Sequence, residues 1–366
     1  MIGGTLLALL GGSCSAAGGG SDLETGADVV AVEWGADAEE PTTNQRPTKV
    51  APDRPIASAA SSGDGGGVGA RISLDGSPTF PRDFADPDVV AHDGAFYAFG
   101  TNTLFMNVPV LSTEVGGIYG EALPELPTWS EPHYVWAPSV TEFGDHWVLH
   151  YTTRHTASGR QCISVAVGGH PGGPFVDDST EPLLCALDQG GAIDPSVIMK
   201  GADPYLLWKS DGNCCALPTI IYSQPLSADG TELAGDPVEL IRNDLWWERD
   251  VVEGPSMIEV DGDWYLLYSA NRWDSADYAV GIARCDSVIG PCVKQPEPWL
   301  SSTDSLAGPG GLEVISLPDR AADLVVYHGW VNGEVGYPDG ARALYARPVR
   351  WTADGLVLIG SVNEGS

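Results

Sequence analysis

The feature that most constrains the fold is an internal repeat of five short segments, each a turn followed by an aromatic and aliphatic strand. The segments read HDGAFYAFGT, FGDHWVLHYTT, GADPYLLWKSD, VDGDWYLLYSA and AADLVVYHGW. Aligning them puts five residues in register, with gaps of 51, 57, 60 and 59 positions: Gly100, Tyr151, Trp208, Tyr268 and Tyr327. Five units over roughly 290 residues predict an all-β, five-bladed β-propeller with about four strands in each blade.

A similar short strand precedes each aligned residue. Asp86, Ala137 and Asp194 lie 14 positions upstream, in ADPDVV, WAPSVT and IDPSVI, and Glu253 lies 15 upstream, in EGPSMI. The fifth unit carries GPGGLEVI instead. If these are the innermost strands of successive blades, their equivalent ends meet at one mouth of the central channel. The repeat therefore predicts that Asp86, Asp194 and Glu253 gather around one pocket.

Three carboxylates in one pocket repel each other, so at least one pKa must rise while another stays low. Glycoside hydrolysis needs such a divergence, because one protonated acid serves the leaving oxygen and one carboxylate activates water. A single Asp-Pro is more simply explained as the start of a strand, since Asp favours turns and Pro is tolerated at a first position. Three acidic residues at equivalent repeat positions favour the chemical interpretation.

Charge and length narrow the class of protein. The 366 residues include 50 Asp and Glu against 18 Lys and Arg, a net charge of −32. Such a chain is repelled by nucleic acids and by anionic membrane surfaces, so a neutral or cationic ligand fits better. The length allows one large domain or two, with a sizeable core.

The first 78 residues differ in composition from the rest. MIGGTLLALLGGSC, residues 1–14, has an apolar run typical of a signal peptide, and it ends at Cys14 like a bacterial lipoprotein cleavage site. No Lys or Arg precedes the run, so lipidation, simple export and a frayed terminus of a cytosolic protein all stay open. Residues 15–78 are rich in Gly, Ala, Ser, Pro and Asp and are expected to form a disordered linker. The propeller domain is then expected over 79–366, in a secreted or cell-surface protein.

Six cysteines follow Cys14, and an exported chain would oxidise them. Cys285 and Cys292 in CDSVIGPC fit a hairpin clamp, and Cys162 with Cys185 would tie neighbouring strands. The adjacent Cys214 and Cys215 form either a vicinal bridge or bonds elsewhere. A zinc site is poorly supported, because there is no CxxC pair and the histidines are scattered.

From about Phe84 to Leu358 the chain resembles glycoside hydrolase family 43. The matching motifs are ADPDVV, WAPSV, GPF, IDPSV, EGPSM, GPGG and VYHGW, in the order and approximate spacing of that family. The resemblance implies an inverting hydrolase of arabinan, arabinoxylan or xylan. It also implies that Asp86 is the general base, that Glu253 is the general acid, and that Asp194 raises the pKa of the acid and orients it.

Two other interpretations stay open at this stage. The fructan-cleaving propellers, a retaining family, also use Asp, Asp and Glu, but they typically show Arg-Asp-Pro and Glu-Cys where this chain has Ile193-Asp194-Pro195 and Glu253-Gly254. A propeller that binds glycans without cleaving them, on an exported and lipid-anchored chain, is the alternative function. Either way the partner is a carbohydrate, and a monomer is expected.

Further candidates surround the carboxylates. Trp136 in VWAPSV is expected to stack on a sugar face, with blade packing as the alternative, and Arg342 resembles a substrate-contacting Arg of the family. A surface salt bridge is the alternative for Arg342. Asp83 and Asp88 are expected to be turn or outward-facing residues. The pair Trp246-Trp247 precedes the acid strand and is expected at the rim of the cleft.

His328 in VYHGW matches a histidine that, in several family members, helps to bind a calcium-type ion beneath the active site. Imidazole is an unusual ligand for a hard cation, so water would supply most of the coordination. The alternative is a core histidine with its hydrogen bonds satisfied. The fifth-blade GPGG also carries Gly311 where a histidine often follows in the family. No cofactor is expected to be required for the reaction.

Overall fold

The structure is a computed structural model that describes residues 77–316, 323–352 and 355–358. In this part of the chain it contains nineteen strands and three short 3₁₀ helices. The helices are η1 (Leu187–Gln189), η2 (Gly212–Cys215) and η3 (Val331–Gly333). The expected all-β class is confirmed.

The strands form five antiparallel sheets, which follow one another along the chain. The first sheet comprises β1 (Asp88–His92), β2 (Ala95–Phe99), β3 (Pro109–Ser112) and β4 (Gly117–Glu121). The second comprises β5 (Ser130–Phe143), β6 (His146–His155) and β7 (Arg160–Gly168). The third comprises β8 (Ala192–Lys200), β9 (Asp203–Ser210), β10 (Ile220–Pro225) and β11 (Val238–Arg242). The fourth comprises β12 (Val252–Val260), β13 (Asp263–Ala270), β14 (Ala279–Cys285) and β15 (Cys292–Lys294). The fifth comprises β16 (Ala307–Ile315), β17 (Asp323–Trp330), β18 (Arg342–Thr352) and β19 (Gly355–Leu358).

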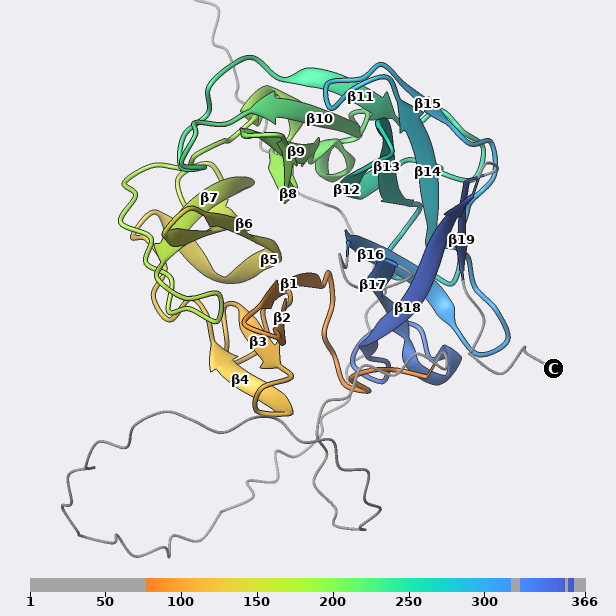
Figure 1. The fold of residues 1–366 in the computed structure, drawn as a ribbon, viewed down its shortest axis with the longest axis horizontal. Helices are drawn as coiled ribbons and strands as arrows, with labels where there is room; N and C mark the ends of the chain where they lie inside the picture. Colours follow the sequence, from red (N-terminus) through yellow and green to blue (C-terminus); the bar gives the residue numbers. More distant parts are fainter. Residues whose placement is uncertain (1–76, 317–322, 353–354, 359–366) are drawn as a thin grey trace, which may run out of the picture. The chain divides into compact units, whose positions relative to one another are not determined.

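The first strand of each sheet lies innermost, around a central axis. Contacts join β1 to β5, β5 to β8, β8 to β12, β12 to β16 and β16 back to β1. Figure 1 shows the five sheets radiating from this ring. The predicted five-bladed propeller is therefore correct, and the aligned residues of the repeat lie in or directly after the second strand of each blade.

Apolar side chains pack between neighbouring blades. Leu207 and Ile221 of the third blade, for example, share one buried cluster with Met257, Leu266 and Tyr268 of the fourth. Because strand residues alternate between faces, each sheet buries one apolar set against the blade before it and the other against the blade after it. This packing fixes the inner strands that carry the site.

The ring is closed by the N-terminal end of the described chain. Phe80 forms an antiparallel bridge with Leu344 of β18, and backbone hydrogen bonds run in both directions between the two residues. The start of the domain thus pairs with the last blade. This pairing joins the two ends of the described chain without an unpaired edge at that point.

The second blade departs from the expected four strands. After β7, the chain pairs with that strand only through isolated bridges at Val176 and Leu184. The connecting segment HPGGPFVDDSTEP is rich in Gly and Pro, which weaken or interrupt a ladder. The disulfide between Cys162 and Cys185 ties this irregular outer segment to β7.

The two expected cysteine pairs, and the vicinal pair that the sequence left open, are present in the described residues. Besides Cys162–Cys185, Cys285 is bonded to Cys292 across the β14–β15 pair. Cys214 is bonded to its neighbour Cys215 within η2, which settles the alternative left open by the sequence. The pairings link residues that are close in sequence, so each one braces a single blade rather than joining two.

The predicted signal peptide at 1–14, with Cys14, and the linker, except for its last two residues, lie outside the described residues. In the part of the chain that is described, no helix has the length and apolar character needed to cross a membrane.

Candidate active site

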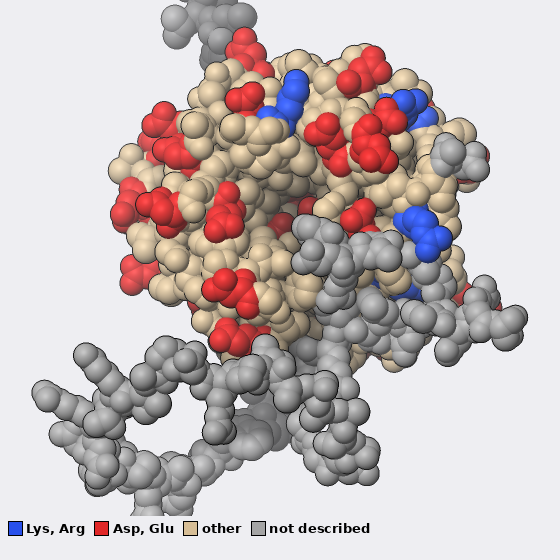
Figure 2. Space-filling view, viewed as in Figure 1, with Lys and Arg blue, Asp and Glu red and all other residues tan. Residues whose placement is uncertain are grey.

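A cavity of about 470 Å³ opens at the centre of the propeller, and Asp86, Asp194 and Glu253 all line it. Figure 2 shows a hollow at the centre of the viewed face, with acidic side chains inside it. The volume lies in the range of ordinary small-ligand sites. Three carboxylates from three different blades thus reach one pocket, as the repeat predicts.

A β-bulge in the inner strands orients the carboxylate side chains toward the cavity. The ladder between first and second strands is interrupted after Trp136, Ile193, Glu253 and Gly310. The next residue has positive φ in each case, and Asp86, just before β1, has it too, at 51°. Positive φ is uncommon for residues other than Gly and is found where a chain must re-aim a side chain.

The bulge explains why Glu253 lies 15 rather than 14 positions before its aligned residue. Gly254, with φ 54°, occupies the bulge position that Asp194 occupies in the third blade, with φ 54°. Glu253 is therefore equivalent to Ile193, one residue earlier on the strand. The three carboxylates are not strictly equivalent in the repeat, although they line the same cavity.

Asp86 is held in its ionised form by its neighbours. Thr101 donates a hydrogen bond to Oδ2 at 2.6 Å, and Arg342 Nη1 lies 3.7 Å from Oδ1. Burial favours the protonated carboxyl, but the charge of Arg342 and the hydrogen bond from Thr101 outweigh burial and lower the pKa of Asp86. Since burial lowers the pKa of His328 to about 3, that ring is neutral and Arg342 supplies the positive charge.

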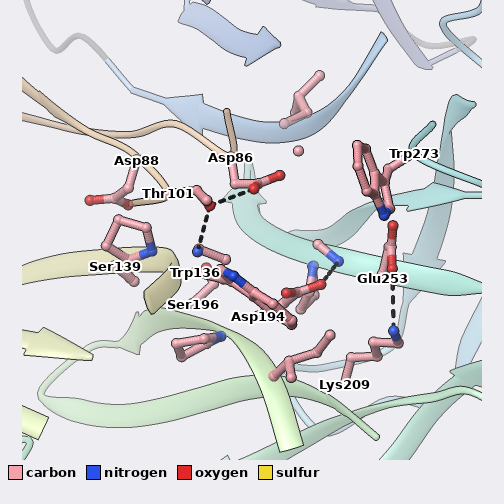
Figure 3. Close-up of a pocket in the computed structure, with 18 of the residues that line it drawn as sticks. Asp86, Asp88, Thr101, Trp136, Ser139, Asp194, Ser196, Lys209, Glu253 and Trp273 are labelled. Atoms are coloured by element: carbon pink, nitrogen blue, oxygen red, sulfur yellow. Dashed lines mark hydrogen bonds and ion pairs between the residues drawn. The ribbon is translucent and has the colours of Figure 1, made fainter. Parts of the chain in front are cut away.

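Glu253 is held at both oxygens, and Asp194 lies close to it. Lys209 Nζ donates to Oε2 of Glu253 at 3.2 Å, and the hydroxyl of Tyr278 donates to Oε1 at 2.8 Å. Asp194 Oδ2 accepts the backbone N–H of Gly254 at 2.8 Å. Burial, and then the charge of Glu253, raise the pKa of Asp194 to about 7. Asp194 therefore keeps its proton to a higher pH than an ordinary aspartic acid does. Figure 3 shows Asp194, Glu253 and Lys209 around the pocket.

The other predicted residues divide between the pocket and its surroundings. Trp136 is partly exposed and lines the cavity, which agrees with a sugar-stacking position. Arg342 also lines it and is 8% exposed, so the alternative of a surface salt bridge is wrong. Its guanidinium lies over the ring of Trp273 at 4.6 Å. Asp83 is exposed and accepts the backbone N–H of Arg342, as a turn residue can.

Two expectations about neighbouring residues are wrong. Asp88 does not face outward: it is buried, lines the same cavity and accepts the N–H of Val140. Two residues along a strand return to the same face, so Asp88 follows Asp86 into the channel. Trp247 is buried in the core between the third and fourth blades instead of at the rim, and Trp246 is exposed without lining the cavity.

The sequence pattern does not single out three further residues that line the pocket. Lys209, Trp273 and Tyr278 all do so. Lys209 directly follows the aligned Trp208, so the next column of the same repeat alignment contains the signal for it. Trp273 and Tyr278 lie in the connection between β13 and β14, which has no counterpart in the repeat pattern.

His328 is fully buried on β17, beside Asp86. Its Nδ1 accepts the backbone N–H of Asp86 at 3.0 Å, so the proton of the neutral ring lies at Nε2, which has no partner among the described residues. An N–H group donates to water and cannot coordinate a cation directly. The residues present do not fit a directly bound calcium-type ion at His328. An ion held near His328 only through water stays a prediction.

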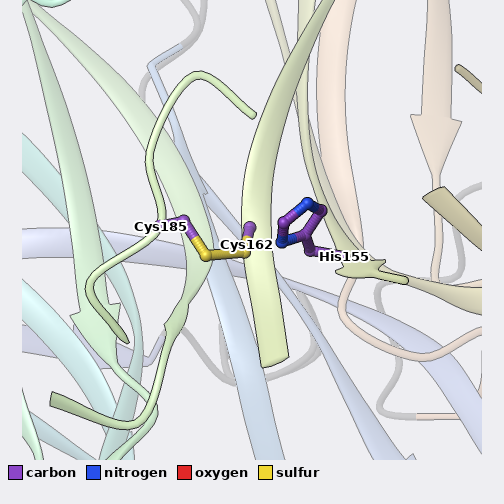
Figure 4. Close-up of side chains that lie close together, drawn as sticks. All are labelled: His155, Cys162 and Cys185. Atoms are coloured by element: carbon purple, nitrogen blue, oxygen red, sulfur yellow. A yellow bond between two sulfur atoms is a disulfide. The ribbon is translucent and has the colours of Figure 1, made fainter. Parts of the chain in front are cut away.

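Another group of potential metal ligands lies in the second blade. Among the described residues, His155, Cys162 and Cys185 form the one group of three whose donor atoms lie close enough to share an ion. Figure 4 shows that the two sulfurs are bonded to each other beside the imidazole. A disulfide has no thiolate to offer, so this group is not a metal site.

Comparison with known proteins agrees with the geometry. The family model described as Glycosyl hydrolases family 43 matches residues 76–357. The chain belongs to this family. It is a glycosidase, and it shares the family's architecture of five blades around a central pocket.

Similar proteins include two fungal enzymes and one solved structure. The chain is 26% identical to the β-D-galactofuranosidase xynD of Aspergillus niger, covering 69% of this chain and 76% of that protein. It is 26% identical to α-L-arabinofuranosidase 43 of Humicola insolens, covering 74% of this chain and 60% of that protein. The crystal structure of a thermostable family-43 glycoside hydrolase is 27% identical, with a TM-score of 0.68 over 78% of this chain and 95% of the other.

Proposed function

We propose that this family 43 protein is an exported, inverting glycosidase that cleaves arabinose- or xylose-containing glycans with water as the only co-substrate. The observation that carries the proposal is the convergence of Asp86, Asp194 and Glu253 on one cavity. Arg342 lies beside Asp86, and Lys209 lies beside Glu253. An ionised base and a protonated acid in one pocket are what the reaction requires.

Asp86 is the general base. Its pKa is lowered, so the carboxylate is ready to take a proton from water as the water attacks the anomeric carbon. The hydrogen bond from Thr101 fixes one carboxylate oxygen, which leaves the other available to orient the water. In inverting glycosidases the two carboxyls stand about 6.5–9.5 Å apart to make room for that water.

Glu253 is the general acid, and Asp194 supports it. The glycosidic oxygen must receive its proton from a carboxyl group, and the charges of Asp194 and Glu253 interact strongly, because the charge of Glu253 helps burial to raise the pKa of Asp194 to about 7. Through the N–H of Gly254, Asp194 also fixes the backbone next to the acid. Bond cleavage transfers the proton to the leaving oxygen, and the pair recovers it from solvent.

Aromatic side chains provide the sugar-binding surface. Trp136 and Trp273 line the cavity, and aromatic rings stack on the apolar faces of sugars. The two similar fungal proteins are named for furanosides of galactose and arabinose. A terminal furanoside such as α-L-arabinofuranose is therefore the first substrate to test. Export is supported by the N-terminal apolar run and by three disulfides in the described residues.

The test is a panel of aryl α-L-arabinofuranosides, β-D-xylosides and β-D-galactofuranosides, together with arabinan, arabinoxylan and xylan. We expect cleavage of at least one, with the first sugar released in the inverted anomeric configuration by proton NMR. Binding of a glycan by the folded protein without cleavage of any substrate would contradict the proposal, and a retained configuration would contradict its stereochemistry.

A further inference from the structure

One position of the repeat makes the same kind of hydrogen bond in four of the five blades. This position directly follows the aligned residue of the second strand. Its side chain accepts the backbone N–H of a bulge residue in the next blade. These four hydrogen bonds, 2.9 to 3.1 Å long, run from Ala137 to Thr101, from Asp194 to Thr152, from Gly311 to Ser269 and from Asp86 to His328. They join blade to blade around the channel.

The third blade breaks this rule. Its residue at the same position is Lys209, whose ammonium group has three donors and no acceptor. The bulge N–H of the next blade, on Gly254, is accepted by Asp194 instead. Lys209 therefore does not accept a bulge N–H, and its Nζ donates a hydrogen bond to Glu253 Oε2 at 3.2 Å.

Lys209 is a buried cation surrounded by acceptors. Its side chain is fully buried, and Nζ also donates to Asn213 Oδ1 at 2.7 Å and lies 3.8 Å from Asp211 Oδ1. Burial favours the neutral amine, but the charges of Glu253, Asp194 and Asp211 outweigh burial and raise the pKa of Lys209. The ammonium therefore stays charged throughout the working pH range.

We propose that Lys209 is a positioning residue that orients the carboxyl of Glu253 and sets the alkaline limit of activity. The inference rests on the proposed role of Glu253 as the acid. A cation 3.2 Å from one oxygen of Glu253 stabilises the ionised form, so the acid loses its proton at a lower pH than Asp194 alone would impose. Lys209 and Asp194 therefore act on the same proton in opposite directions.

The other charged groups near the acid do not cancel this effect. Asp194 on β8 and Asp211 after β9 are negative when ionised, and Asp211 is itself paired with Lys209 and influenced by Arg160. Tyr278, whose pKa is raised by burial, is a neutral donor to Oε1. Asp86 is also negative and has its own cation.

The test compares pH–rate profiles of kcat/KM for the wild type and two variants. Lys209→Thr introduces the residue that the first two blades carry at this position, as Thr101 and Thr152, and so can accept the N–H of Gly254. Lys209→Met keeps the length of the side chain without the charge. The matched control is Lys200→Met, on the exposed end of β8 in the same blade.

In both variants we expect the alkaline limb to move to higher pH by about 1–3 units, the range for removing an opposite charge in contact. The acidic limb, set by Asp86, and the profile of the Lys200 control should not move. Lys209→Arg, which restores the charge, should bring the alkaline limb back toward the wild type.

An alkaline limb that stays in place or moves to lower pH in the folded variants would overturn the inference. Failure of both variants to fold would also overturn it, because the role of Lys209 would then be structural. An inactive wild type on every substrate would instead count against the proposed function. The two failures are therefore distinguishable.

Discussion

Acidic residues line two levels of the same channel, and the two levels differ in the cations that accompany the carboxyls. The catalytic level consists of Asp86, Asp194 and Glu253. The inner level consists of the residues two positions beyond the bulge on each inner strand: Asp88, Ser139, Ser196, Ser256 and Glu313. The inner level thus has two carboxyls and three hydroxyls, and Asp88, Ser139, Ser196 and Glu313 of this level line the cavity.

The catalytic level has a cation on each side, and the inner level has none within ion-pair distance among the described residues. Arg342 accompanies Asp86, and Lys209 accompanies Glu253. At the inner level burial raises the pKa of Asp88 to about 7 and that of Glu313 as well, with Asp88 adding to the effect on Glu313. The nearby cation thus distinguishes Asp86, whose pKa is lowered, from Asp88, whose pKa is raised by burial.

The largest expected effect comes from removing the catalytic carboxyls. Asp86→Asn should lower kcat/KM about 10²–10⁴-fold on every substrate, because water must be activated whatever group leaves. Glu253→Gln should cause a similar loss on polymers but spare aryl glycosides, whose phenolate departs without protonation. Steady-state kinetics on both substrate types measure this, with Glu259→Gln on the exposed face of β12 as control. Near-normal polymer cleavage by either variant would contradict the assignment.

A smaller effect is expected when Asp194 loses its charge. Asp194→Asn should move the alkaline limb of the pH–rate profile to lower pH by about 1–3 units, because removing a neighbouring negative charge lowers the pKa of the acid. The amide oxygen can still accept the N–H of Gly254. Asp188→Asn, on an exposed position of η1, is the matched control. An alkaline limb that stays in place or moves to higher pH would contradict this role of Asp194.

Arg342→Met should move the acidic limb of the pH–rate profile. Arg342 lowers the pKa of Asp86, so without it the base becomes protonated at a higher pH and the acidic limb rises by about 1 unit. Arg350→Met, exposed on the same strand β18, should leave the limb unchanged. The pH profile of kcat/KM on an activated aryl glycoside measures this, because that leaving group needs no proton from the acid. An acidic limb that does not move would show that Arg342 does not control the pKa of Asp86.

The smallest effect on catalysis is expected at the inner level. Asp88→Asn should change kcat/KM little, since the carboxyl touches no reacting group in the proposed mechanism. The native pKa of Asp88, about 7, exceeds its ordinary 3.8, so the native state binds the extra proton and loses stability as pH rises from 4 through 7. The Tm of the variant should therefore fall less between pH 5 and pH 8 than the Tm of the wild type, when both proteins are measured in the presence of a chelator. An equal loss in both proteins would contradict this.

Much of this architecture can be predicted from the sequence because propeller blades repeat. The five aligned residues correctly mark the second strands, and the 14-residue offset leads to the inner strands. The offset of 15 at Glu253 is already a sign that this carboxyl stands one position from the others. Only the bulge at Gly254 explains how it still reaches the pocket.

The sequence cannot show what depends on contacts between blades. Trp273 and Tyr278 come from a single connection outside the repeat, and their positions depend on packing against Arg342, Trp330 and His328. Asp88 and Asp86 belong to the same Asp-Pro-Asp motif, yet Arg342, far along the chain, lowers the pKa of Asp86, while burial raises the pKa of Asp88.

What the sequence by itself determined is the number of blades, the order of the inner strands and the identity of three carboxyls that share a pocket, because strand periodicity and repeat spacing are local properties. What only the tertiary structure decided is the electrostatics of those carboxyls. Arg342 lies 256 residues from Asp86 and Lys209 lies 44 from Glu253, and charges act through space over a few ångströms rather than along the chain.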